Sequence, residues 1–284
     1  MEIRKLTDIS IIIPFFRGNK YINTLLECIY KNKKNILQTL EVILVNDSPN
    51  VDIQIKPKFI EKLDIVMIKH ENNKGIHAAR VTGLSRARGE YIIFLDQDDL
   101  LMDNAICSQI ESIGNEYMVC ANAYIEQSNG VYKKLYKNNI QHKMVNDLIF
   151  YLYLGNRIVS PGQVMLKKDL IPKEWKHNLL INNCSDDLYL WILLLNCGCK
   201  FALNNQCIYT HRYTGVNCSG NIENVYKSAS EMIGYIEHNE TLNSLYISLY
   251  KRRLNFEKAH WRICYLWNID IILFKIMHKI ISYL

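Results

Sequence analysis

The sequence lacks the features that are typical of fibrous, disordered and membrane-spanning proteins. Five prolines and 12 glycines in 284 residues exclude a collagen-like chain and a Pro/Gly-rich disordered chain. No run reaches the roughly 18 uninterrupted apolar residues that a membrane-spanning helix needs. The first eight residues, MEIRKLTD, lack the apolar core of a signal peptide. We therefore expect a soluble, cytoplasmic protein.

The cysteine pattern contains no disulfide framework. The nine cysteines are an odd number, none are spaced Cys-x-x-Cys, and several lie inside apolar runs, which is typical of reduced thiols. The Gly-x-Gly-x-x-Gly turn of a dinucleotide-binding dehydrogenase is also missing, because the first apolar run continues into PFFRG. The Gly-rich basic loop expected of a nucleotidyltransferase is missing at the same place.

What the sequence does have is enough apolar material for a sizeable core. It is 49% hydrophobic and 22% charged, as in ordinary globular proteins. The formal charge of +6 suits phosphorylated or acidic partners but also an ordinary solvated surface. Nucleic-acid binding is not expected, because no basic run accompanies a recognisable nucleic-acid module.

Apolar runs alternate with helical patterns in the first hundred residues. We expect strands at 9–14, 40–45, 65–68 and 91–95, with helices near 21–30 and 75–88. This order predicts a mostly parallel sheet with helices on both faces. Ligands of such sheets bind beyond the carboxyl ends of the strands. The polar clusters at 46–48 and 96–99 both lie there.

The second half alternates less regularly. Strands are expected at 117–126, 131–136, 164–166, 199–203 and 207–210. Helices are expected at 147–154 and 188–196, and from about residue 222 onward.

Three carboxylates follow the fourth expected strand within four residues: Asp96, Asp98 and Asp99. Like charges crowded at a sheet edge are unfavourable unless a positive group is present. Oxygen ligands without nearby His or Cys suit a hard cation, Mg²⁺ or Mn²⁺, which could neutralise a departing diphosphate. The alternative is an acidic start to the helix expected near Asp103.

Four segments in order resemble the family 2 glycosyltransferases, which have the GT-A fold. They are SIIIP at 10–14, EVILVNDS at 41–48, NKGIHAAR at 73–80 and GEYIIFLDQDD at 89–99. The resemblance covers the first hundred residues almost continuously and the second half more loosely. It implies a GT-A, Rossmann-like α/β domain at 1–220, with a nucleotide-binding half at about 1–115 and an acceptor half at about 116–220. A C-terminal helical extension would follow at 221–284.

The resemblance also implies roles for individual residues on the donor side. Asp47 would accept a hydrogen bond from the uracil ring, although an Asp in such a turn is otherwise usually an Asx-turn former. Arg80 would lie near the nucleotide or steady the acidic cluster, although by itself it could equally be a helix-surface residue. Asp96 would face the ribose or uridine side, and Asp98 would be the main metal ligand. Pro14 and Gln97, within the matching segments, are candidates for the same nucleotide-binding site.

A second acidic pair, Asp186 and Asp187, resembles the family's Glu-Asp at the head of a helix. By that match Asp187 would be the general base that takes a proton from the acceptor hydroxyl, a role typically worth ~10²–10⁴-fold in rate. Attack from the face opposite the diphosphate would invert the anomeric carbon. The alternative is that Ser185 or Asp186 simply caps the following helix.

One segment departs from the family pattern. Where a Tyr-Arg-x-His sequence is common, this chain has YTHRYT at 209–214, with Thr214 at the usual His position. His211 could replace that histidine as a third metal ligand beside Asp98 and Asp96, or be an ordinary structural histidine. Arg212 is a candidate contact for the diphosphate.

The C-terminal sixty residues mix basic, aromatic and apolar residues. The run 269–281 is interrupted by charges and cannot span a bilayer. It could lie in the surface of an anionic membrane, or pack on the rest of the chain or a second subunit. A homo-oligomer and a location at the inner face of the membrane therefore remain open.

The expected function is metal-dependent transfer of a hexose or N-acetylhexosamine from a UDP-sugar donor to a hydroxyl of a glycan acceptor. The acceptor could be a polysaccharide, a lipid-linked glycan or a glycoprotein, and the cofactor Mn²⁺ or Mg²⁺. The alternative is a non-catalytic, nucleotide-binding relative that acts as a scaffold subunit.

Overall fold

The computed structural model describes residues 8–215, 220–258 and 266–283. Packing divides the chain into two compact units, each assembled from three stretches of sequence. Unit 1 comprises residues 1–135, 160–171 and 201–214, and unit 2 comprises residues 136–159, 172–200 and 215–284. Unit 2 thus takes in part of the expected acceptor half together with the C-terminal helices.

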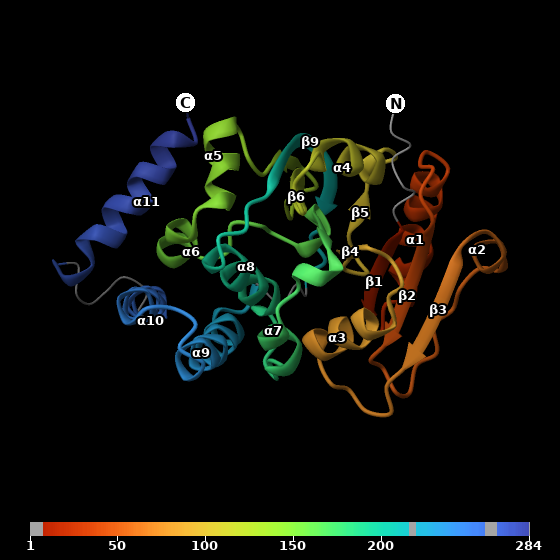
Figure 1. Cartoon of the computed structure of the whole chain (residues 1–284), viewed down its shortest axis with the longest axis horizontal. Helices are drawn as coiled ribbons and strands as arrows, with labels where there is room; N and C mark the ends of the chain where they lie inside the picture. The colour runs from red at the N-terminus through yellow and green to blue at the C-terminus, as the bar shows by residue number, and fades with distance from the viewer. Residues whose placement is uncertain (1–7, 216–219, 259–265, 284) are drawn as a thin grey trace. The chain divides into compact units, whose positions relative to one another are not determined.

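The strands of the described part form one mixed sheet in unit 1 (Figure 1), in the order β3-β2-β1-β4-β8-β6-β9-β5, with β7 paired to β6. The first four in this order are parallel, whereas β8 runs antiparallel to both β4 and β6. Their bounds are β1 Ile9–Phe15, β2 Leu40–Asn46, β3 Asp64–Lys69, β4 Tyr91–Phe94, β5 Leu100–Leu101, β6 Met118–Glu126, β7 Tyr132–Lys134, β8 Val164–Lys167 and β9 Ala202–His211.

The helices of unit 1 follow the strands that they connect. They are α1 Asn19–Lys33, α2 Pro57–Lys62, α3 Ile76–Arg86 and α4 Ala105–Ile113, with short 3₁₀ turns η2 Pro161–Gln163 and η3 Lys168–Leu170. Pro57 begins α2, where its fixed φ and missing N–H are tolerated. Basic residues end α1, where they complement the helix dipole.

Both faces of the central strands are buried. The odd-numbered residues of β1 pack with Leu25, Leu26 and Ile29 of α1 in one apolar core. On the opposite face α3 packs on β1 and β2. A Cβ at Gly83 of α3 would lie 2.4 Å from Ile12 Cγ2, so glycine allows this close approach. The carboxyl ends of β1, β2 and β4 are thereby held at one edge.

Unit 2 consists of helices. They are α5 Asn139–Lys143, η1 Met144–Asn146, α6 Leu148–Leu154, α7 Lys173–His177, α8 Asp186–Asn196, α9 Ile222–His238, α10 Ser244–Lys258, η5 Leu266–Asn268 and α11 Ile269–Ile281. The run LYLWILLL within α8 is buried almost all round, as its uniform hydrophobicity predicts. Among the described residues, no helix has the length and hydropathy that crossing a membrane requires.

The structure confirms the predicted α/β fold and the C-terminal helices. It differs from the expectation in the short helices α2, α5 and α7, which were not predicted, and in two strands. The strands expected at 199–203 and 207–210 are one strand, β9, which pairs with β6 across a register irregularity at Asn122. β5, only two residues long, was not expected and pairs with β9. The seven cysteines in the described part are all free thiols, as their spacing indicated.

Candidate functional site

The acidic segment after β4 turns back toward β9, and its last carboxylate is the most buried. Asp99 is 1% exposed. Its carboxylate accepts from the backbone N–H of Arg212 (2.9 Å) and contacts the Tyr209 hydroxyl and His211 Nδ1 (3.2 Å). Burial raises the pKa of Asp99 even though His211 and Tyr209 bond to it. Asp99 therefore ties the acidic segment to the end of β9.

Asp96 is held from two sides. Arg80, buried on α3, donates from Nη2 to Asp96 Oδ1 at 2.5 Å, and the Ser160 hydroxyl donates to Asp96 Oδ2 at 3.1 Å. A buried guanidinium with a charged partner is a strong, directional contact. Through this ion pair Arg80 would steady the acidic cluster, one of the roles expected for it.

Asp98 lies between these anchored neighbours. Burial, followed by the negative charges of Asp99 and Asp96, raises the pKa of Asp98 to about 6. A carboxylate shifted in this way at a sheet edge is a candidate for a functional group. Its backbone carbonyl accepts from Arg212 Nε, so the position of the residue is fixed through its main chain.

Gln97 fixes the loop between β1 and α1. Its side-chain amide makes two hydrogen bonds with the backbone of Phe16, accepting from N–H (3.0 Å) and donating to C=O (2.9 Å). A Cβ at Gly18 would lie 2.0 Å from Gln97 Oε1, so a larger residue there would displace the Gln97 amide from these two bonds. Arg17, at a φ of 51°, donates its backbone N–H to Ser48 Oγ (2.8 Å). Ser48 and Gln97, one from each polar cluster, thus both hydrogen-bond to the loop between β1 and α1.

Asp47 organises the segment before α3. Its Oδ1 accepts from the backbone N–H of Lys74 (2.7 Å) and contacts His70 Nδ1 (2.8 Å), and its Oδ2 accepts from the backbone N–H of Gly75 (2.9 Å). The resembling segments at 41–48 and 73–80 are therefore joined directly. An ionised carboxylate has about four acceptor sites, so Asp47 keeps capacity for one more donor at Oδ2.

Arg212 and Pro14 complete the donor-side candidates. The Arg212 guanidinium lies 5.1 Å from the centre of the Tyr21 ring, a cation–π arrangement with α1. Pro14 is buried within β1 opposite Val45 of β2, one residue before the strand ends. Both residues therefore belong to the edge formed by the ends of β1, β4 and β9.

The candidate metal ligands fit a divalent cation only in part. Among the described residues, no group of three or more His, Cys, Asp or Glu side chains could hold a metal ion. The carboxylate of Asp96 is bonded to Arg80 and Ser160. Asp98 does fit a cation that draws its other ligands from a diphosphate, because Mg²⁺ is often held by one or two carboxylates and substrate phosphates.

Asp99 holds the His211 ring in an orientation that suits a metal ligand. Burial opposes its protonation, yet the hydrogen bond and charge of Asp99 raise the pKa of His211. Metal-binding histidines usually donate their other ring N–H to a carboxylate, as His211 Nδ1 is placed to do with Asp99. The second ring nitrogen, Nε2, would be the atom that binds a cation.

Asp187 lies in unit 2, in the first turn of α8. Its Oδ2 accepts from Asn156 Nδ2 (2.8 Å), and its Oδ1 accepts from the backbone N–H of Leu188 (2.7 Å). Ser185, the N-cap residue, makes no side-chain capping bond, so capping by Ser185 does not account for the pair. Cys184, just before the helix, has a φ of 112°, a strained conformation of the kind found at functional sites.

Tyr209 was not predicted as a site residue, although it lies at the centre of the unit 1 site. Tyr209 is fully buried on β9, and its hydroxyl lies 2.5 Å from Ser160 Oγ and against Asp99. A Cβ at Gly162 would lie 2.3 Å from the Tyr209 ring. The available signal was the Ser-Pro-Gly-Gln turn at 160–163, whose glycine makes room for the tyrosine.

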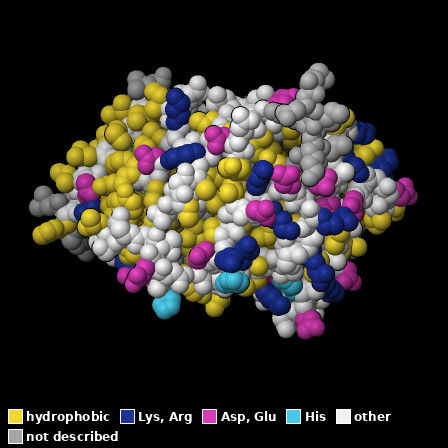
Figure 2. Space-filling view, in the orientation of Figure 1, with side chains coloured by type: hydrophobic (Ala, Val, Ile, Leu, Met, Phe, Trp, Pro, Cys, Tyr) yellow, Lys and Arg dark blue, Asp and Glu magenta, His cyan; other side chains and the backbone are white. Residues whose placement is uncertain are grey.

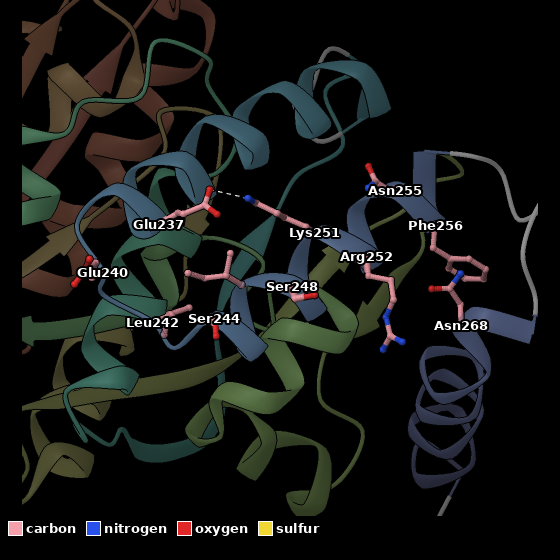
Figure 3. Close-up of a pocket in the computed structure, with 11 residues that line it drawn as sticks. Glu237, Glu240, Leu242, Ser244, Ser248, Lys251, Arg252, Asn255, Phe256 and Asn268 are labelled. Carbon is pink, nitrogen blue, oxygen red and sulfur yellow. Dashed lines mark hydrogen bonds and ion pairs between the residues drawn. The ribbon is translucent and has the colours of Figure 1, made fainter.

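A separate cavity of about 1070 Å³ lies in unit 2 and contains none of the predicted donor or base residues. Figure 3 shows Lys251 directed at Glu237, an ion pair of 2.6 Å. Arg252, also on its lining, pairs with Asp270 of α11. Because both cations are neutralised by carboxylates, this cavity does not offer a binding site for a diphosphate.

Comparison with known proteins decides the family. The model of glycosyl transferase family 2 matches residues 10–175, which is more than half of the chain. The chain belongs to glycosyl transferase family 2. An uncharacterised glycosyltransferase of Haemophilus influenzae is 27% identical to this family 2 glycosyltransferase over 227 residues, which cover 78% of this chain and 84% of the relative.

Solved structures show a similar fold. S. aureus TarS in complex with UDP-GlcNAc matches with a TM-score of 0.63 and 20% identity, over 88% of this chain and 73% of TarS. The mannosyltransferase PcManGT from Pyrobaculum calidifontis, in complex with GDP-Man and Mn²⁺, matches with a TM-score of 0.53 and 14% identity, over 94% and 73% of the two chains. At these identities the likeness is one of fold.

Proposed function

We propose that this family 2 glycosyltransferase moves a hexose or N-acetylhexosamine from a UDP-sugar to a hydroxyl of a glycan acceptor, with inversion at the anomeric carbon. The observation that carries the proposal is the carboxylate of Asp98. It lies beside Asp96 and Asp99 at the ligand-binding edge of the sheet, and its pKa is raised to about 6. Such an arrangement is costly for stability alone and suits the binding of a charged donor.

UDP is the proposed donor nucleotide for two reasons. The fold neighbour TarS was solved with UDP-GlcNAc. Asp47 Oδ2, with one backbone donor at Gly75, has capacity to accept the imide N–H of uracil. Pro14, Arg80, Asp96 and Gln97 would shape the same side of the site by fixing the loops around it.

The diphosphate would be held by Asp98, His211 and Arg212. A bound Mn²⁺ or Mg²⁺ would neutralise negative charge on the departing UDP. Asp98 would ligate it through its carboxylate and His211 through Nε2, while Arg212 would add a guanidinium suited to phosphate oxygens. Asp99 and Tyr209 would not touch the donor but would hold these three residues in place.

Asp187 is the proposed general base. The acceptor oxygen would bond to the anomeric carbon as the bond from that carbon to the diphosphate oxygen breaks. The proton of the acceptor hydroxyl would pass to the Asp187 carboxylate, and UDP would leave. Asn156, which donates to Asp187 Oδ2 at 2.8 Å, would orient the carboxylate for this transfer.

Two isosteric variants and one control test the proposal. Asp98→Asn should lose metal-dependent binding of UDP, measured by calorimetry with and without Mn²⁺. Asp187→Asn should bind UDP as the wild type does and lose about 10²–10⁴-fold in kcat, measured as UDP release in the presence of acceptor. Asp169→Asn, an exposed carboxylate on η3, should change neither quantity.

The results separate an enzyme from a scaffold. Equal turnover by Asp187→Asn and the wild type would rule out its role as the base. UDP binding without release of UDP from any of UDP-glucose, UDP-galactose or UDP-GlcNAc would favour the non-catalytic alternative. Turnover of GDP-mannose in their place would show that the proposed donor nucleotide is wrong.

A further inference from the structure

Helix α11 carries an apolar face that the rest of the described chain leaves uncovered. Ile269, Leu273, Ile276 and Ile280 recur at spacings of four, three and four residues, and each is at least half exposed. Figure 2 shows hydrophobic side chains gathered over α11. On its other face, Ile271 is fully buried, so the helix is anchored to unit 2. Exposed apolar patches of this kind mark interaction surfaces.

Aromatic residues stand at both ends of this face. Trp267, just before the helix, is 79% exposed, and Tyr283, just after it, is 74% exposed. Trp and Tyr combine an apolar ring with a polar atom, so they are favoured where an apolar layer meets water. A protein core or a tight helix pair would instead enclose such rings.

The charge around the face is positive once internal ion pairs are discounted. Asp270 is neutralised by Arg252, and Glu257 accepts from both Lys275 (2.8 Å) and Arg253 (2.6 Å). These pairs account for the carboxylates of α10 and α11 within the described residues.

Two exposed lysines near α11 have no carboxylate partner in the described part of the chain. Lys279 is exposed on α11, and Lys137 lies over the Tyr283 ring at 4.8 Å. This excess of positive charge beside an apolar face is complementary to an anionic lipid surface.

We propose that α11 binds the surface of an anionic membrane, lying in the plane of the interface with Ile269, Leu273, Ile276 and Ile280 inserted among the lipids. Thirteen residues give a helix of about 20 Å, enough to lie on a bilayer and too short to span one. A second copy of the chain is the rival occupant. A two-fold contact of this face with itself would bring the unpaired lysines of both copies together, so the charges favour lipid.

Sedimentation with vesicles tests this surface in the full-length protein. The wild type should sediment with vesicles of phosphatidylcholine that contain about one third phosphatidylglycerol. It should bind vesicles of phosphatidylcholine alone at least about tenfold more weakly. The double variant Leu273→Glu, Ile276→Glu should lose at least about tenfold in binding to the anionic vesicles. Lys279→Glu should lose a smaller part, about fivefold or more.

Matched controls separate the face from general effects of charge and hydrophobicity. Ile181→Glu changes an isoleucine of unit 2 that is 82% exposed, and Lys173→Glu changes an exposed lysine of α7. Both should bind vesicles as the wild type does. Circular dichroism and melting of each variant should match the wild type, because every altered side chain is exposed.

Two outcomes would overturn the proposal. One is equal sedimentation of the wild type and the double variant with anionic vesicles, or sedimentation of neither. The other is a wild-type dimer in light scattering that the double variant converts to a monomer, with no binding to vesicles; this would assign the face to a second copy of the chain.

Discussion

Glu41 shows how a single charged residue is accommodated inside a strand that otherwise reads as apolar. It is buried in β2, where its carboxylate accepts from Ser10 Oγ (2.5 Å), the backbone N–H of Arg88 (2.6 Å) and Arg88 Nε (2.8 Å). A Cβ at Gly89 would lie 2.6 Å from the Ser10 backbone nitrogen. Glu41 therefore links β1 and β2 to the chain that enters β4.

We expect Glu41→Gln to destabilise the fold in a pH-dependent way. Burial opposes ionisation, but the bonds from Ser10 and Arg88 outweigh it and lower the pKa of Glu41 below 4.5. The stabilisation is therefore full above the unfolded-state pKa and is lost as pH falls through the lower folded-state pKa. At pH 7 the variant should lose about 1.5–3 kcal/mol of unfolding free energy, measured by urea denaturation.

The difference between wild type and Glu41→Gln should shrink as the pH approaches 3, because the carboxyl of the unfolded chain then binds a proton that the folded protein binds only at lower pH. Glu61→Gln, at an exposed position of α2, should have no effect at either pH. A loss that is as large at pH 3 as at pH 7 would show that shape, rather than charge, accounts for the role of Glu41.

At the scale of an element, two helical glycines should respond in opposite ways to alanine. Alanine in a helix interior is normally favoured over glycine by about 0.8–1 kcal/mol. At Gly83 of α3 the added Cβ would meet Ile12 Cγ2 at 2.4 Å and Val45 Cγ2 at 3.3 Å, so Gly83→Ala should lose about 1–3 kcal/mol from overpacking.

At Gly234 of α9 nothing lies within 4 Å of the added Cβ, and Gly234→Ala should gain about 0.5–1 kcal/mol. The denaturant midpoints of both variants, determined at one pH, give the two changes in stability. A gain in stability at both positions would mean that α3 can move away from the sheet without loss.

The elements that the sequence predicted best are those fixed by local pattern. β1, β2 and β4 are buried on both faces and read as continuous apolar runs. β9 was divided in two because the polar run 204–206 interrupts it; Asn204 is buried there and donates to Ser108 Oγ (2.7 Å). β5 is too short to leave a periodic signal.

The part of the candidate site that is local in the sequence was predictable, whereas its distant partners were not. The aspartates at 96–99 are contiguous and follow a clear strand, so the sequence placed them at the sheet edge. The partner of Asp99 could not be found locally, because Tyr209 lies 110 positions away. It reaches Asp99 only through the antiparallel pairing of Leu101 with Tyr209.

At the scale of the whole molecule, each unit is built from segments that alternate along the chain. A cut at residue 220, where sequence reasoning placed a boundary, therefore leaves unit 1 complete and removes α9, α10 and α11 from unit 2. Met232 and Ile236 of α9 are fully buried, Ser228 donates to the Asn182 backbone carbonyl (2.7 Å), and Asn196 donates to that of Thr241 (2.7 Å). All of these contacts would be lost.

We expect a chain that ends at residue 220 to keep the sheet and lose the packing of α7 and α8. Limited proteolysis should then cleave within 172–200 much faster than in the full chain, because local unfolding follows the loss of buried apolar contacts. A chain that ends at Lys258 retains α9 and α10 and loses from α11 only one buried side chain, Ile271. It should resist cleavage in that segment as the full chain does. If the shorter chain were equally resistant, α8 would not depend on the C-terminal helices, and residues 221–284 would be an independent extension, as the sequence first indicated.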